Sequence, residues 1–165
     1  MDVTIIRYVQ KHLHNGFTDA VFPFFSRLGN AGAVWFLLAL YMGLRYRSRN
    51  AALMLFCALA LSHILSQIIK RAIGRPRPFE TYPVDSLLVH RPGGYSCPSG
   101  HSSSSFAAAT ILLAENRRVG AAALILAGLI AFSRIFVFVH YPSDTIFGAF
   151  IGVLSALLVL FLCGM

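Results

Sequence analysis

Long apolar blocks separated by short polar segments are the feature that most constrains the fold of this chain. The blocks cover residues 31–44, 51–69, 102–114, 119–132 and 145–162. Blocks of this kind are typical of helices that cross a bilayer, whose hydrocarbon core of about 30 Å needs about 20 residues. Charged residues make up 12% of the chain, whereas soluble domains average about 25%, and the mean hydropathy is +0.70. We therefore expect an all-α, integral membrane helical bundle.

The five apolar blocks predict five spans, or six if the N-terminal region also inserts. Some blocks are shorter than 20 residues, so these spans must recruit flanking polar residues. Residues 1–14 carry their apolar side chains largely on one helical face, which predicts an amphipathic helix lying in the membrane interface. Because this stretch lacks a continuous apolar core, we expect no cleavable signal peptide. Residues 17–28, aromatic and interrupted by Pro23, predict a second interfacial or partly inserted helix.

The length of 165 residues predicts one domain. We expect a single membrane-embedded domain over residues 1–165, with N-terminal helices in 1–30 and a transmembrane core in 31–163.

The formal net charge of +8 could suggest nucleic-acid binding, but the cations are confined to segments between or beside the apolar blocks. Two short loops hold several of them, namely Arg45, Arg47, Arg49, Arg117 and Arg118. Positive charge in short loops favours the cytoplasmic side of a membrane. Alternation of the spans then places residues 70–101 and 134–144 together on the opposite, non-cytoplasmic face. We expect the bilayer as a partner and no nucleic acid.

The segment from Lys70 to Pro78 is the first candidate anion site. Pro76 and Pro78 disfavour a helix beyond Gly74, so Lys70 and Arg77 can approach one centre from different directions. Arginine presents a planar fork to phosphate oxygens, and lysine supplies a compact charge. Basic residues at the end of a span can also reach lipid headgroups. That alternative is favoured for Arg71 and Arg75, and for Lys70 and Arg77 the two readings are equally supported by this segment alone.

The segment Pro98-Ser99-Gly100-His101 directly precedes an apolar block. Free backbone N–H groups at a helix N-terminus bind anions, and glycine permits close approach. Ser99 could equally cap the helix. His101 falls in the first turn, where it would face an anion bound there.

The third segment contains Ser133, Arg134, His140 and Asp144. Pro142 is suited to the first turn of a helix, and Asp144 then falls in that turn. Its carboxylate can accept one ring N–H of His140, which leaves the other nitrogen as a nucleophile. Asp144 could also serve only as a helix-start charge. Ionisable residues at membrane depth are costly and are usually functional.

The three segments together resemble the signature of the type 2 phosphatidic acid phosphatase superfamily, also called lipid phosphate phosphatases. That signature reads Lys-x6-Arg-Pro, Pro-Ser-Gly-His and Ser-Arg-x5-His-x3-Asp. This chain matches it at residues 70–78, 98–101 and 133–144, with every spacing retained. The resemblance covers about residues 51–162 and leaves the first 30 residues outside.

The resemblance implies metal-independent phosphoryl transfer through a phosphohistidine, so no cofactor is expected. His140 would match the nucleophile, Asp144 its orienting carboxylate, and His101 the acid that protonates the leaving oxygen and then activates water. The phosphate-binding positions would be Lys70, Arg77, Ser99, Gly100 and Arg134. This agrees with the general requirement of phosphoryl transfer for positioning and charge stabilisation. The three cysteines have neither an even disulfide framework nor a metal-ligand spacing.

The resemblance to small bacterial members further implies a lipid phosphate as substrate and an inner-membrane location. Substrates of such members include undecaprenyl diphosphate, phosphatidylglycerol phosphate, phosphatidic acid and lipid A phosphates. The loop over residues 79–96, with His90, Arg91 and Gly93-Gly94, is expected to shape the headgroup pocket, and Arg75 and Arg91 would suit a diphosphate. The sequence leaves the substrate and the oligomeric state open.

Two other functions compete with hydrolysis. A binder or transporter of lipid phosphates would use the same basic pocket, but it would not need two histidines and an orienting carboxylate. A phosphotransferase of the same superfamily would pass the phosphate to an alcohol rather than to water. A soluble haloperoxidase with the same motifs is excluded by the apolar composition.

Overall fold

The fold is entirely helical in the part of the chain that the structure describes. A computed structural model describes residues 1–45, 49–84 and 86–164. The helices are α1 (Asp2–His12), α2 (Thr18–Leu28), the 3-10 helix η1 (Asn30–Gly32), α3 (Ala33–Arg45), α4 (Arg49–Ile73), α5 (Pro78–Thr81), α6 (Gly100–Glu115), α7 (Arg117–Phe136) and α8 (Pro142–Leu162). No strand occurs in these residues, so the predicted all-α fold is confirmed.

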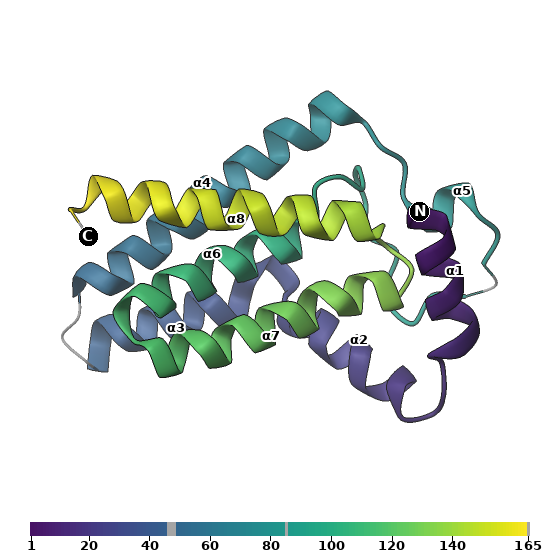
Figure 1. The fold of residues 1–165 in the computed structure, drawn as a ribbon, viewed down its shortest axis with the longest axis horizontal. Coiled ribbons are helices and arrows are strands. Elements are labelled where there is room, and N and C mark those ends of the chain that lie inside the picture. Colours follow the sequence, from purple (N-terminus) through teal and green to yellow (C-terminus); the bar gives the residue numbers. More distant parts are fainter. Residues whose placement is uncertain (46–48, 85, 165) are drawn as a thin grey trace.

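Helix α6 lies at the centre of the bundle and packs against α4, α7 and α8 (Figure 1). Small residues permit the close approach of α6 and α8. A Cβ atom at Gly152 would lie 2.2 Å from the backbone oxygen of Ser103, and one at Gly148 would lie 2.4 Å from that of Ser99. This packing brings the start of α8 against the start of α6, which places two of the three signature segments side by side.

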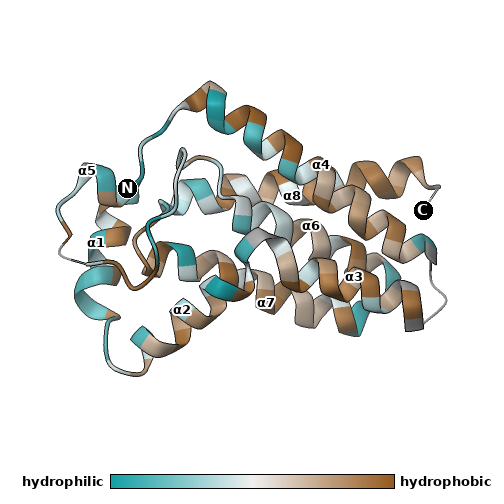
Figure 2. Ribbon diagram, turned by 180° about the vertical axis from the view of Figure 1, so that it is seen from behind, coloured by the Kyte–Doolittle hydropathy of each residue, from teal (hydrophilic) through white to brown (hydrophobic). Residues whose placement is uncertain are grey.

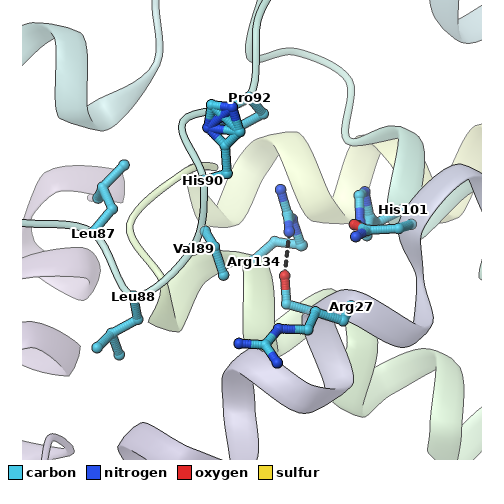
Figure 3. A pocket seen from close by; sticks show the side chains of 10 residues that line it. Arg27, Leu87, Leu88, Val89, His90, Pro92, His101 and Arg134 are labelled. Carbon is cyan, nitrogen blue, oxygen red and sulfur yellow. Dashed lines mark hydrogen bonds between the residues drawn. The ribbon is translucent and has the colours of Figure 1, made fainter.

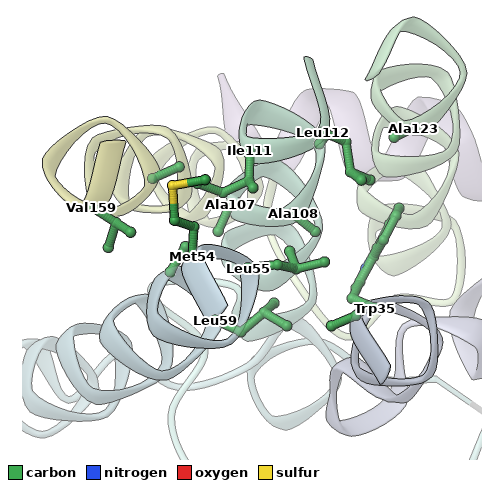
Figure 4. Close-up of a cluster of buried hydrophobic side chains, with 14 of the residues drawn as sticks. Trp35, Met54, Leu55, Leu59, Ala107, Ala108, Ile111, Leu112, Ala123 and Val159 are labelled. Carbon is green, nitrogen blue, oxygen red and sulfur yellow. The ribbon is translucent and has the colours of Figure 1, made fainter. Parts of the chain in front are cut away.

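Aliphatic and small side chains fill the core between α3, α4, α6, α7 and α8 (Figure 4). Trp35 is the largest of them and is 1% exposed. Its indole Nε1 donates a hydrogen bond to Ser105 Oγ at 3.0 Å, and Ser66 Oγ donates to Ser103 Oγ at 2.9 Å. These bonds satisfy polar groups that would be costly in an apolar interior.

Three helical segments are long and apolar enough to cross a membrane. They are Asn50–Thr81, Arg117–Phe136 and Pro142–Leu162. The pair Thr18–Leu28 and Ala33–Met42, bent by 54°, could form a fourth. Helix α6, with 16 residues, is shorter than a usual span, so five or six spans remain a prediction. The loop predicted to hold Arg47 falls in residues 46–48, outside the described part of the chain.

The N-terminal helices pack onto the polar end of the bundle. Helix α1 contacts α7 and α8 and buries Ile6 and Val9, and α2 contacts α7. Helix α2 continues through Pro23, which costs one intrahelical hydrogen bond without ending the helix. Both helices form where they were predicted, and their place in the membrane interface remains a prediction.

Polar residues gather at the end of the molecule that holds α1 and α5 (Figure 2). The C-terminus lies at the opposite end, where α3, α4 and α8 carry mostly apolar side chains. Helix α4 ends at Ile73, and Gly74 follows with a φ of +62°, a conformation that glycine adopts readily. The predicted end of this helix before Pro76 is thus observed, and the chain then turns into the polar end.

Candidate active site

The three signature segments meet around one cavity of about 340 Å³ at the polar end. Six of the eight predicted site residues line it: Lys70, Arg77, Gly100, His101, Arg134 and His140. The other two, Ser99 and Asp144, are fully buried beside it. The fold therefore brings together residues that are separated by up to 74 positions in the chain.

Arg77 is held rigidly at the wall of this cavity. It is the N-cap residue of α5 and is 4% exposed. Its guanidinium donates to the carbonyl oxygens of Gly93 at 3.0 Å, Gly94 at 2.9 Å and Val139 at 3.0 Å. The Gly93-Gly94 segment, predicted to shape a headgroup pocket, thus fixes a cation in place. Lys70, in the last turn of α4, is tied to the same loop through the Tyr95 carbonyl, 2.6 Å from its Nζ.

Arg134 is a buried guanidinium in the last turn of α7. It is 4% exposed, its Nη1 donates to Ser26 Oγ, and its Nε has no hydrogen-bond partner among the described residues. In the described part of the chain, no ion pair joins a carboxylate to Arg134, Arg77 or Lys70. Buried cations normally require a counter-charge, so this wall of the cavity is suited to an anion.

His140 is fully buried in the short connection between α7 and α8, with one ring nitrogen toward Arg77. Arg77 Nη1 lies 3.3 Å from His140 Nε2, and because arginine can only donate, Nε2 accepts and carries a lone pair. Burial lowers the pKa of His140 from 6.5 to about 3, and the nearby cations Arg134 and Arg77 add to this effect against the opposing influence of Asp144. The imidazole is therefore neutral at physiological pH.

The carboxylate of Asp144 lies on the other side of the His140 ring. Its Oδ2 is 3.7 Å from His140 Nδ1, longer than a hydrogen bond. The Ser96 hydroxyl lies near both groups, donating to Asp144 Oδ2 at 2.5 Å and lying 3.5 Å from His140 Nδ1. The predicted pairing of Asp144 with His140 is thus present as a contact that includes Ser96. Asp144 Oδ2 also accepts the backbone N–H of Tyr141 at 2.9 Å.

Ser99 acts as the N-cap of α6 and does not line the cavity. Its Oγ accepts a 3.4 Å hydrogen bond from the Ser102 N–H, and its own N–H donates to the Asp144 carbonyl at 2.9 Å. The capping alternative is therefore observed, while Gly100 and His101 in the first turn face the cavity. His101 Nε2 lies 3.1 Å from Asn30 Oδ1 of η1.

A second cavity, of about 630 Å³, lies between α2 and the loop over residues 87–92. His101 and Arg134 line it as well as the first cavity, and Arg27 and His90 also border it (Figure 3). This second cavity therefore lies between the first cavity and the part of the 79–96 loop that was expected to contact the headgroup.

Four site residues were not predicted as such. Ser26 and Asn30 contact Arg134 and His101 from the N-terminal region, and Ser96 lies between His140 and Asp144. Arg75, assigned to headgroups or a diphosphate, instead donates to Asp144 Oδ1 at 2.7 Å. The sequence held no local signal for this role of Arg75, because residues two apart in an extended segment point to the same side, so Arg75 would be expected to face the same way as Arg77. The contacts of Ser26 and Asn30 had no local signal.

Comparison with known proteins places this geometry in a family. Residues 51–163 match the model of the PAP2 superfamily. The chain belongs to this superfamily, the type 2 phosphatidic acid phosphatases, as its signature predicted.

Individual relatives extend the match beyond the family model. An undecaprenyl-diphosphatase from Sulfolobus acidocaldarius is 30% identical over 90% of this chain and 70% of the relative. A lipid A 1-phosphatase from Rhizobium johnstonii is 38% identical over 62% of this chain and 46% of its own length. The crystal structure of Aquifex aeolicus LpxE has a TM-score of 0.85 and 28% identity, covering 97% of this chain and 94% of that one. The family and these members indicate an integral membrane lipid phosphatase, a hydrolase of phosphate ester bonds.

Proposed function

We propose that the chain hydrolyses the phosphoester or diphosphate bond of a membrane lipid through a phosphohistidine on His140, at the non-cytoplasmic face. The observation that carries this proposal is a set of three cations that have no carboxylate partner among the described residues and lie beside a neutral, buried histidine. Such a wall would hold the phosphoryl oxygens and stabilise the charge that develops on them. Lys70, Arg77 and Arg134 would do this together with the Gly100 backbone.

In the first step, the His140 Nε2 lone pair forms a bond to phosphorus while the bond from phosphorus to the leaving oxygen of the lipid breaks. His101 donates a proton to that oxygen, and the lipid product leaves as an alcohol, or as a monophosphate if the substrate is a diphosphate. In the second step, His101 accepts a proton from water as the water oxygen attacks phosphorus. The P–N bond breaks, inorganic phosphate is released, and neutral His140 is regenerated.

Asp144 would keep the proton of His140 on Nδ1 and stabilise the positive charge that the ring gains during attack. Its 3.7 Å separation leaves room for this contact to shorten as the ring becomes positive. Ser96 would steady the carboxylate by its own hydrogen bond. Contacts of this kind commonly tighten only in the transition state.

The substrate would be one of the lipids implied by the family: undecaprenyl diphosphate, phosphatidylglycerol phosphate, phosphatidic acid or a lipid A phosphate. A site at the polar end of an apolar bundle is suited to a phosphate in the headgroup layer. The positive turn at Arg117 and Arg118 lies at the opposite ends of α6 and α7 and favours the cytoplasm. We further propose that the protein lies in a bacterial inner membrane with its site on the periplasmic or extracellular face. It would have five or six spans and form one domain over residues 1–165.

Phosphate release from a panel of lipid mono- and diphosphates, by protein purified in detergent with EDTA present, tests this function. We expect release by the wild type and at least a 1,000-fold loss of kcat in His140→Ala, since removing a covalent nucleophile can cost up to about 10⁶-fold. A lipid labelled in its terminal phosphate should leave an acid-labile, base-stable label on the wild type and none on the variant. Full activity in His140→Ala would overturn the nucleophile assignment. Binding of lipid phosphates without release would favour a binder, and phosphate transfer to added alcohols a transferase.

A further inference from the structure

A third cavity, of about 300 Å³, runs from the catalytic centre down one side of α4 toward the apolar part of the bundle. It shares Gln67, Gly100 and His101 with the catalytic cavity, and residues of α3, α4, α6 and η1 line the rest. Its lining is mostly apolar, with Phe36 and Leu59 among the contributors. The cavity therefore adjoins the site where we place the phosphate.

Four polar side chains line this cavity, and two of them, His63 and Gln67, come from α4 and are exposed. They share one face of α4 with Lys70, since the three lie four and three residues apart. At 1.5 Å per residue, Gln67 is about 4.5 Å and His63 about 10 Å below Lys70 along the helix. The polar interfacial layer is about 5–8 Å thick on each side of the hydrocarbon core. His63 and Gln67 thus lie at the depth where the linker between headgroup and hydrocarbon chains would be.

Neither side chain has a hydrogen-bond partner among the described residues. Polar groups at membrane depth are costly unless they are satisfied, and ionisable ones usually serve function. We propose that His63 and Gln67 donate hydrogen bonds to the ester or amide carbonyl groups of an acylated lipid phosphate. The enzyme then prefers acylated lipids to polyprenyl phosphates, whose hydrocarbon begins at the phosphate oxygen and offers no acceptor at this depth.

This specificity rests on the proposed function, and its test compares three monophosphates in identical mixed micelles: a diacylglycerol phosphate, its dialkyl ether analogue and a polyprenyl phosphate. We expect the wild type to favour the diacyl lipid over both others in kcat/KM. In His63→Leu this preference should fall by about 3- to 10-fold, the usual worth of one or two hydrogen bonds, with a smaller fall in Gln67→Leu. The loss should come from the diacyl rate, with the polyprenyl rate unchanged.

Ile64→Leu, at a position in the same turn that does not line the cavity, is the matched control and should leave the ratio unchanged. Equal wild-type rates on diacyl and dialkyl lipids, or an unchanged ratio in His63→Leu, would overturn the proposal. Failure of the wild type to release phosphate from any of the three lipids would instead overturn the proposed function.

An independent observation concerns Arg75, which joins the N-terminus of the chain to the catalytic carboxylate. Its Nη1 donates to Asp144 Oδ1 at 2.7 Å and to Ser143 Oγ at 2.8 Å, and its Nη2 donates to Asp2 Oδ2 at 2.9 Å. The guanidinium also lies 3.8 Å from the centre of the Tyr141 ring. Asp2 in turn accepts the Ser143 N–H at 3.0 Å.

These contacts complete the coordination of Asp144, whose other oxygen is held by Ser96 and the Tyr141 N–H. The geometry points to Arg75 as a positioning residue that acts on His140 through Asp144, with Asp2 of α1 fixing Arg75. Because both ends of its guanidinium are engaged by carboxylates, Arg75 does not serve as a phosphate ligand.

The test separates positioning from phosphate binding by measuring kcat, KM and inhibition by inorganic phosphate, again on the proposed activity. Arg75→Ala should lower kcat by about 10- to 100-fold, as loss of an outer partner of a functional histidine does elsewhere, with KM and phosphate inhibition little changed. Arg75→Lys should recover part of the loss, and Asp2→Asn should show a smaller decrease. Arg77→Ala, in contrast, should weaken phosphate inhibition.

Two results would overturn this role: a weakening of phosphate inhibition in Arg75→Ala equal to that in Arg77→Ala, or a loss of activity no greater than the loss of folded protein. An inactive wild type would count against the proposed function and not against the role of Arg75.

Discussion

At the scale of single residues, the protein separates cations that are fixed and buried at the cavity from cations that are exposed to solvent. Arg77 is buried, fixed by three backbone carbonyls and adjacent to His140. Arg71 is exposed and lies at the rim of the cavity. Two arginines six residues apart therefore differ in rigidity and in solvation. We expect this difference to decide how much each contributes to kcat/KM.

We expect Arg77→Ala to lower kcat/KM by about 10²- to 10³-fold, the usual cost of removing a preorganised donor to a developing anion. Arg71→Ala should change it by about threefold or less, because an exposed charge is screened by water and salt. Steady-state phosphate release by both variants measures the difference. Equal losses would show that Arg71 contributes to the phosphate site as much as Arg77 does.

The buried, neutral His140 predicts how the stability of the fold depends on pH. Its pKa is about 3 in the folded protein against an ordinary 6.5, so between these values the unfolded chain binds a proton that the folded protein does not. Stability from this group therefore rises with pH in that window and falls on acidification below about pH 6.5. From pH 7.5 to pH 5 the loss should be about 2 kcal/mol.

Thermal unfolding of detergent-solubilised wild type and His140→Gln at these two pH values measures this loss. The wild-type midpoint should fall by about 4–8 °C more than that of the variant, since all other titrating groups are common to both. A parallel fall in both proteins would mean that His140 is protonated in the folded state at pH 5.

At the scale of helices, contact between α6 and α8 depends on Gly148 and Gly152. Replacing Gly152 with alanine places a methyl group 2.2 Å from the Ser103 carbonyl oxygen and 2.9 Å from the Ala107 nitrogen. Both are backbone atoms that cannot move aside, so Gly152→Ala should destabilise the bundle by about 1–3 kcal/mol. Because α8 carries Asp144, activity should fall as well.

Gly128→Ala in α7 is the matched control, because a Cβ there meets nothing within 4 Å and alanine favours the helix by up to about 1 kcal/mol. Midpoints of thermal unfolding in detergent compare the two variants. If Gly152→Ala proved as stable as Gly128→Ala, the close contact of α6 and α8 would be disproved.

Helices were also the scale at which the sequence was most informative. The apolar blocks predicted α3, α4, α6, α7 and α8 to within a few residues, since apolar runs and the stops at Gly74 and Pro142 are local signals. The signature spacings predicted the residues around the catalytic cavity. The contacts between Asn30 and His101 and between Asp2 and Arg75 could not be predicted, because each joins residues about 70 positions apart through packing that no local pattern encodes.

At the scale of the whole molecule, the polar end with α1 and α5 opposes an apolar end at the C-terminus (Figure 2). The turn between α6 and α7 lies one helix length from the catalytic cavity, and its Arg117 and Arg118 are exposed. If the positive turn faces the cytoplasm, the cavity must face the other side. Single cysteines in a background lacking Cys57, Cys97 and Cys163 can report this orientation.

We expect a membrane-impermeant maleimide applied to intact cells or spheroplasts to label Thr81→Cys, at the end of α5 beside the site, and not Glu115→Cys, at the end of α6. Both positions are exposed, so both should react after the membrane is permeabilised, which is the control for accessibility. Phosphate release by each labelled protein shows that it is folded. The reverse labelling pattern would place the site in the cytoplasm, where a phosphatase would meet newly made lipids rather than those already moved across the membrane.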